Sequence, residues 1–195
     1  MKRTISKTLR ILGGVVVGLL LLLAGYLYWT WPVYPSFTRE LGSVSELRET
    51  LSKGKTTSSI VVVDLSDYGA SEQMFSVDLN GRTRNAEPIC CHIDSQNAWT
   101  DGAFRIGVSA GEELWKDASF DGESYRGMDA KLFVSDAQST KRGMELDLRC
   151  STYEYAIAVS FDAVGLSEQE ISQREADMQV LVYSIADRII DAAAP

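Results

Sequence analysis

Residues 144–161, MELDLRCSTYEYAIAVSF, alternate apolar and polar side chains through two consecutive segments. Every second position is apolar in residues 144–148, and the same holds for residues 153–161. A period of two residues is typical of strands that bury one face. This stretch therefore predicts two strands that follow one another, and Cys150 falls on the parity of the buried residues.

A long amphipathic helix is predicted after these strands. The tetrapeptide Ser167-Glu168-Gln169-Glu170 matches a capping box, which marks the start of a helix. Apolar residues then recur at helical spacing up to about Ala192: Ile171, Met178, Leu181, Val182, Ile185, Ile189 and Ile190. The same spacing suits a coiled-coil seam, but it extends over fewer than four heptads, so packing against the sheet is favoured.

Upstream segments alternate between helical and extended patterns. They predict a short helix over residues 37–51 with a capping box at 43–46, and a brief helix after a capping box at 109–112. Strands are predicted at 60–63, 74–79, 103–109 and 130–134. A hairpin turn is predicted at Asn80-Gly81 and a surface loop at 117–129. Strands in the middle with helices at both ends indicate an α+β fold. We expect an antiparallel sheet covered on one face by the long C-terminal helix.

Residues 11–31, ILGGVVVGLLLLLAGYLYWTW, contain no charge and are almost entirely apolar. At about 1.5 Å per residue, such a helix is long enough to cross a hydrocarbon core of about 30 Å. We therefore predict a transmembrane anchor at 11–31, a tail at 1–10, a linker at 32–37 and a single α+β domain at 38–195. A cleaved signal peptide is the alternative, although its apolar region is usually only about 7 to 15 residues long.

The charges around the apolar run predict its orientation. Four basic residues precede it, whereas only Arg39 lies among the fifteen residues that follow. This bias predicts a single-pass protein of the cell membrane, of bacterial type, with a cytoplasmic N-terminus and an extracytoplasmic domain. Aromatic residues expected at the membrane interface are Tyr26, Tyr28, Trp29, Trp31 and Tyr34. Gly14 and Gly18 form a small-residue pair through which two anchors could dimerise.

The chain carries a formal net charge of −8. Its densest basic groups, Arg82 with Arg84 and Lys141 with Arg142, are too small to offset that charge for nucleic-acid binding. We therefore expect the lipid bilayer and a protein at the membrane as partners, and no nucleic acid.

Cys90, Cys91 and Cys150 are the three cysteines of the chain, and all are candidates for a disulfide. A bridge from Cys90 or Cys91 to Cys150 would close a loop of about 60 residues, a length at which a disulfide restricts the unfolded chain strongly. A Cys90–Cys91 bridge and three reduced thiols are the alternatives.

His92 is the only histidine, so thiol or metal chemistry would have to use it. Cys90, His92 and Cys150 together offer ligands suited to zinc or copper(I), but their spacing is not that of a structural zinc site. No glycine pattern for binding phosphates or dinucleotides is present. We expect no cofactor and no catalytic residues, and interpret the domain as an interaction or ligand-binding module; a thiol- or soft-metal-binding protein is the alternative.

The C-terminal half resembles a known family. Gly127-Met128-Asp129-Ala130, a strand ending at Cys150, a further strand and a helix containing Ala186 are similar to small anchored bacterial lipoprotein domains of the Mog1/PsbP-like type. The resemblance covers about the last 105 residues and implies a binding or accessory module without catalytic activity. The chain departs from that pattern because it lacks the lipidated cysteine and has adjacent cysteines at 90 and 91.

Overall fold

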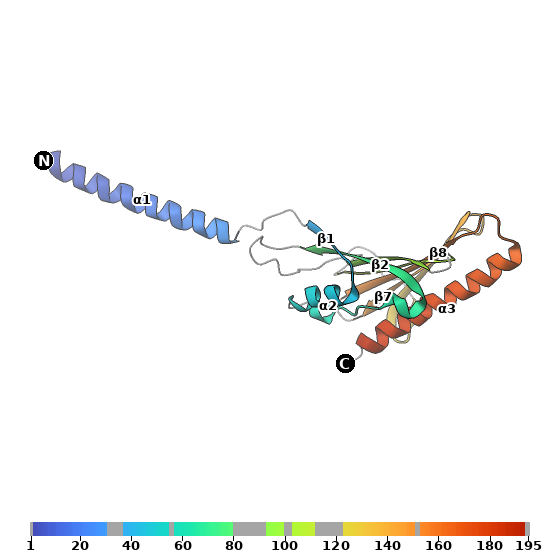
Figure 1. Cartoon of the computed structure of the whole chain (residues 1–195). Helices are drawn as coiled ribbons and strands as arrows, with labels where there is room; N and C mark the ends of the chain where they lie inside the picture. The colour runs from blue at the N-terminus through green and yellow to red at the C-terminus, as the bar shows by residue number, and fades with distance from the viewer. Residues whose placement is uncertain are drawn as a thin grey trace. The chain divides into compact units, whose positions relative to one another are not determined.

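The computed structural model describes residues 2–30, 37–54, 57–79, 93–99, 103–111, 123–150 and 153–193 (Figure 1). The chain divides into two compact units, Met1–Tyr34 and Pro35–Pro195. In the first unit the structure describes one helix, α1 (Lys2–Thr30). The second holds all the strands, and each unit is described by itself.

The helix α1 begins at Lys2 and so includes the segment predicted as a tail at 1–10. In the part of the chain that the structure describes, no helix is both long and apolar enough to cross a membrane. The predicted transmembrane anchor at 11–31 is therefore wrong. The single-pass localisation, with its cytoplasmic N-terminus and extracytoplasmic domain, is contradicted by the same finding.

Residues predicted to act within that anchor are only partly described. The side chain of Tyr26 is described and exposed, whereas the side chains of Tyr28 and Trp29, and all of Trp31 and Tyr34, lie outside the described set. Gly14 and Gly18 lie on α1 with open space where a Cβ would be. Dimerisation through these two glycines stays a prediction.

The second unit contains one antiparallel sheet of eight strands in the order β1-β2-β3-β4-β8-β7-β6-β5. Two meanders of four strands each thus meet where β4 pairs with β8. The strands are β1 (Phe37–Leu41), β2 (Ala70–Leu79), β3 (Ile93–Trp99), β4 (Arg105–Gly111), β5 (Glu123–Tyr125), β6 (Met128–Val134), β7 (Lys141–Cys150) and β8 (Tyr153–Asp162).

One face of this sheet forms the core. Apolar residues at alternate positions of β7 and β8 are buried there, as the two-residue period predicts, and Cys150 is buried with them. The helix α3 (Glu168–Ala193) runs along this face, against β7 and β8 (Figure 1). It buries Met178, Leu181, Val182, Ile185, Ala186, Ile189 and Ile190. The α+β fold, with an antiparallel sheet covered by the C-terminal helix, is confirmed.

Two helices begin at the capping boxes that the sequence contains. At α3, the backbone N–H of Ser167 donates to Glu170 Oε2 at 2.8 Å, and the N–H of Glu170 donates back to Ser167 Oγ at 3.4 Å. At α2 (Val44–Ser52), the N–H of Glu46 donates to Ser43 Oγ at 3.2 Å. These bonds satisfy N–H groups that a helix start leaves without partners.

Two predicted elements before residue 64 differ from the structure. Residues 37–41 form strand β1 rather than helix, because a spacing of four between Phe37 and Leu41 fits both periods and β2 supplies a partner strand. Residues 60–63 do not form a strand: they lie between the 3₁₀ turns η1 (Thr57–Ser59) and η2 (Leu65–Tyr68), and the N–H of Val61 donates to the Tyr155 hydroxyl at 3.0 Å. Ser109, predicted to open a capping box, lies inside β4, and the brief helix predicted after that box lies outside the described residues.

The predicted loop at 117–129 is wrong where the structure describes it, because β5 and the start of β6 form a hairpin there. Its turn uses positive φ angles at Arg126 (51°) and Gly127 (83°), which suit a two-residue hairpin. The turn directs the Arg126 guanidinium onto α3, where it pairs with Asp187 at 3.0 Å and Asp191 at 2.8 Å. The predicted turn at Asn80-Gly81 lies outside the described residues.

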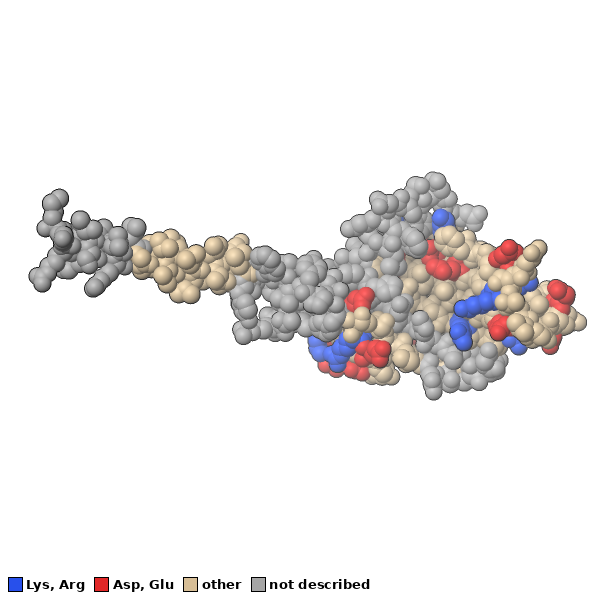
Figure 2. Space-filling view, turned by 90° about the horizontal axis from the view of Figure 1, so that it is seen from above, with Lys and Arg blue, Asp and Glu red and all other residues tan. Residues whose placement is uncertain are grey.

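Described Lys and Arg side chains lie beside Asp and Glu on the face of the molecule seen in Figure 2. Ion pairs such as Arg126–Asp187 and Arg188–Asp67 also place opposite charges side by side. The expectation that nucleic acid is not a partner stays a prediction.

Candidate functional site

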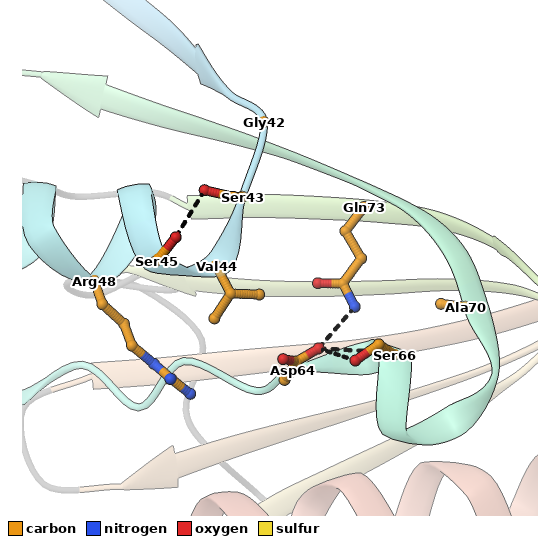
Figure 3. Close-up of a pocket in the computed structure, with 9 residues that line it drawn as sticks. All are labelled: Gly42, Ser43, Val44, Ser45, Arg48, Asp64, Ser66, Ala70 and Gln73. Atoms are coloured by element: carbon orange, nitrogen blue, oxygen red, sulfur yellow. Dashed lines mark hydrogen bonds between the residues drawn. The ribbon is translucent and has the colours of Figure 1, made fainter.

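A polar pocket of about 490 Å³ lies between the start of α2, the turn η2 and the start of β2 (Figure 3). We call it the Arg48–Asp64 pocket. Its lining residues are Gly42, Ser43, Val44, Ser45, Arg48, Asp64, Ser66, Ala70 and Gln73. Three separate segments of the chain therefore contribute to one hollow.

The orientation of α2 decides which of its residues reach the pocket. Leu47 and Leu51 are buried in the core, and the flank of the helix beside them faces the pocket. Val44 and Arg48 are four residues apart, so they lie on one side of the helix, and both line the pocket. The guanidinium of Arg48 forms no hydrogen bond or ion pair with the described residues. It is close enough to Asp64 to help lower the pKa of that carboxyl.

Asp64 is the N-cap of η2, and its carboxylate is held from two directions. Its Oδ1 accepts from the backbone N–H of Ser66 at 3.0 Å, from the Ser66 hydroxyl at 2.5 Å and from Gln73 Nε2 at 3.0 Å. The bond from the Ser66 side chain, followed by those from Gln73 and the Ser66 backbone, lowers the pKa of Asp64. The group is thus a carboxylate at neutral pH. Its Oδ2 accepts no hydrogen bond from any described residue.

Gln73 contributes a carbonyl oxygen whose orientation is fixed. Because its Nε2 donates to Asp64, the side-chain amide cannot turn freely, and Figure 3 shows the oxygen on the side nearer α2. This Oε1 is buried and has no hydrogen-bond partner among the described residues. A buried acceptor without a partner typically costs about 1–3 kcal/mol, so such an atom is informative about what the pocket could hold.

The start of α2 adds favourable sites for an anion. Unpaired N–H groups at a helix start carry a partial positive charge, and the Ser43 and Ser45 hydroxyls lie 3.0 Å apart beside them. Glu46 would oppose an anion there, but its carboxylate is engaged by Arg39 at 3.1 Å and by the N–H of Gly42 at 3.4 Å. The pocket thus has an anion-accepting side at Arg48 and a cation-accepting side at Asp64 and Gln73.

The pKa of Asp64 is unfavourable for general-base chemistry at neutral pH. A general base works best with a pKa near the working pH, whereas the Ser66 and Gln73 hydrogen bonds lower the pKa of Asp64. Ser66 donates its hydroxyl proton to Asp64, and no histidine lines the described pocket to activate that hydroxyl.

The residues predicted from the sequence are elsewhere. Cys150 is the free thiol of the described chain; it is buried, and burial raises its pKa. Cys90, Cys91 and His92 lie outside the described residues, so the disulfide pairing stays a prediction, as does a thiol or soft-metal site at Cys90, His92 and Cys150. Within the described ranges, no three His, Cys, Asp or Glu side chains are grouped to hold a metal ion.

Sequence reasoning missed the residues of this pocket. The pattern Asp64-x-Ser66 is an N-cap signal that could have placed the Asp64 carboxylate at a turn. Nothing local marks Arg48 or Gln73, because their neighbourhood depends on how α2 and β2 are placed by the sheet.

The chain matches no family model, and no curated protein or solved structure is significantly similar to it. The resemblance to Mog1/PsbP-like domains is thus neither supported nor refuted.

Proposed function

We propose that the domain of residues 35–195 is a ligand-binding module without catalytic activity. Its ligand is a small molecule that carries both an ammonium and a carboxylate group, such as a free amino acid, held in the Arg48–Asp64 pocket. The observation that carries this proposal is the buried Gln73 Oε1, which has no partner among the described residues and lies next to an ionised carboxylate.

The ammonium group accounts for the acceptors on one side of the pocket. Asp64 offers Oδ2 and Gln73 offers Oε1, and the hydrogen bond between these two side chains keeps both acceptors together. An ammonium has three donors and a positive charge, so it suits a carboxylate that lies beside an amide oxygen. Hydrogen bonds in which at least one partner is charged are stronger than those between neutral groups.

The carboxylate group accounts for the other side. A guanidinium recognises a carboxylate through two parallel hydrogen bonds, and Arg48 has no competing partner among the described residues. The N-terminus of α2 adds a partial positive charge on the same side. A volume of about 490 Å³ falls in the range usual for small-molecule sites, about 300–1,000 Å³.

Titration of the full chain with glycine tests this proposal. Isothermal titration calorimetry should detect saturable binding of glycine, and weaker or no binding of methylammonium or acetate, each of which has only one of the two groups. The variants Arg48→Gln and Gln73→Leu should each weaken glycine binding about tenfold, the loss expected for one charge-assisted contact.

Lys53→Gln is the matched control, because Lys53 lies at the other end of α2 and pairs with Glu49 at 3.1 Å on the surface. It removes the same charge from the same helix and should leave glycine binding unchanged. No binding of glycine to the wild-type chain contradicts the proposal, and so does equal binding of glycine by the wild type and Arg48→Gln.

A further inference from the structure

A second cavity, of about 500 Å³, lies at one end of the sheet where three parts of the chain meet. The end of β7 and the start of β8 form one wall, the extended segment 58–62 forms another, and the last turn of α3 closes a third side. Its lining residues are Ser58, Ser59, Ile60, Val61, Val62, Cys150, Tyr153, Tyr155, Ala192 and Ala193. We call it the Tyr153 cavity, and it shares no lining residue with the Arg48–Asp64 pocket.

The walls that the described residues give this cavity are uncharged. Aliphatic side chains and alanines make up half of the described lining, and none of the lining residues is Asp, Glu, Lys, Arg or His. Burial raises the pKa of the Cys150 thiol and raises the pKa of Tyr155 to about 12, so both groups keep their protons. A protonated thiol is neither a good nucleophile nor a metal ligand. The cavity is therefore suited to a neutral molecule.

One polar atom of the lining residues lacks a partner. Tyr155 already accepts from the N–H of Val61 at 3.0 Å, whereas the hydroxyl of Tyr153 is buried and has no hydrogen bond to any described residue. Tyr153 is only 2% exposed, so water does not satisfy this group from the surface. A few polar groups within mostly apolar walls are the usual composition of a small-molecule site, in which they fix the orientation of the ligand.

The end of α3 indicates the sign of the ligand's polar group. Ala192 and Ala193 belong to the last turn of this helix, where backbone carbonyls give a partial negative charge. The last turn contains no basic residue that would offset it. A carboxylate or phosphate is disfavoured here, whereas a hydroxyl can donate to a carbonyl or a phenol oxygen and accept from the phenol as well.

We infer that the Tyr153 cavity binds a small neutral molecule with an apolar body and one hydroxyl group. The hydroxyl pairs with Tyr153, and the apolar body lies against Ile60, Val62 and the alanines at the end of α3. This inference does not depend on the function proposed for the Arg48–Asp64 pocket.

Cyclohexanol is the probe for the test, with cyclohexanecarboxylate and methylcyclohexane as matched compounds of the same ring. Saturation-transfer NMR on the full chain should show saturable binding of cyclohexanol and none of cyclohexanecarboxylate. Tyr153→Phe removes only the hydroxyl, and should weaken cyclohexanol binding about fivefold while leaving methylcyclohexane binding unchanged.

Two further variants place the probe. Ala193→Leu fills the cavity and should abolish binding of both rings, with circular dichroism confirming that the helix content of the chain is unchanged. Gln73→Leu alters the other pocket and should leave cyclohexanol binding unchanged. The inference is overturned if cyclohexanol does not bind the wild type, if it binds Tyr153→Phe equally well, or if folded Ala193→Leu still binds it.

Discussion

The two faces of β7 have the same length and the same neighbouring strands, yet burial has opposite consequences for them. On the inner face, Leu146 and Leu148 are buried beneath α3, where removal of apolar surface from water stabilises the fold. On the outer face, Asp147 is also only 4% exposed, and there burial works against a charged group. Alternation along a strand thus assigns each residue to a face, but it does not show how far that face is exposed to water.

The carboxylates of the outer face share few donors. Arg149 Nε donates to Glu154 Oε1 at 2.9 Å, while Glu154 Oε2 and Asp147 Oδ1 have no partner in the described part of the chain. Burial, followed by the charges of Glu145 and Glu154, raises the pKa of Asp147 to about 6, and Lys131 on β6 only partly offsets this. The outer face therefore holds a carboxyl group whose charge is unfavourable at neutral pH.

The largest expected effect is on the inner face. Leu148 is fully buried, so Leu148→Ala should lower the free energy of unfolding by about 2–5 kcal/mol through lost burial and an unfilled cavity. Urea unfolding followed by circular dichroism measures this change. Leu132→Ala on β6 is the control: its side chain is 38% exposed, and the loss should be well below that of Leu148→Ala. Equal losses would mean that the described core is wrong at β7.

A smaller change of opposite sign is expected on the outer face. Folded Asp147 keeps its proton up to about pH 6, whereas the unfolded chain releases it near 3.8. The free energy of unfolding should therefore fall as the pH rises from about 4 to 6, and the loss persists above that range. Asp147→Asn should remove this loss and raise the free energy of unfolding at pH 8 by about 1–3 kcal/mol.

Urea unfolding of Asp147→Asn at pH 4 and at pH 8 separates the charge from the shape of the side chain. The gain should be present at pH 8 and nearly absent at pH 4. Asp129→Asn, an exposed carboxyl on β6 whose side chain shares the outer face, should change little at either pH. A gain from Asp147→Asn that is the same at both pH values would rule out the buried charge as its cause.

The smallest expected effect concerns α3, the helix that covers the inner face of the sheet. Ser167→Ala removes the hydroxyl that accepts from Glu170 and should lower the free energy of unfolding by about 1 kcal/mol. Thermal unfolding is sensitive enough to detect it. Ser172→Ala, an exposed position inside α3, should leave stability unchanged or slightly higher, since alanine favours helix. A loss as large at Ser172 would indicate a general effect of serine rather than of the cap.

The fold was predictable where the sequence pattern of an element agreed with the neighbouring element against which it packs. The strands β7 and β8 and the helix α3 follow from alternation, helical spacing and the Ser167 capping box. The strand predicted at residues 60–63 was wrong because β-branched side chains favour burial as much as strand pairing. The structure buries Ile60 and Val63 without pairing this segment in the sheet. The apolar run at 11–31 predicted an anchor from composition, which the described helices do not support.

The two cavities were not predictable. Arg48, Asp64 and Gln73 come from a helix, a turn and a strand, and only the sheet order brings them together. Tyr153 reads as one more core residue of an alternating strand, and its missing hydrogen-bond partner becomes visible only when its neighbours are placed. Sequence patterns indicate which face a residue is on, whereas a pocket depends on what the neighbouring elements fail to fill.

The order of the strands has a consequence for synthesis of the chain. One edge of β4 pairs only with β8, so residues 105–111 have no partner on that edge until residues 154–160 have been translated. At about 5–20 residues per second, that edge lacks its partner for roughly 2 to 10 seconds, and an open edge can pair with other chains. Ribosome-stalled chains that end at 150 should therefore be captured by a chaperone more than chains that extend well past 162; equal capture would contradict this. The first meander therefore leaves the ribosome with one unpaired strand edge, and only the last strand of the chain, β8, pairs with that edge.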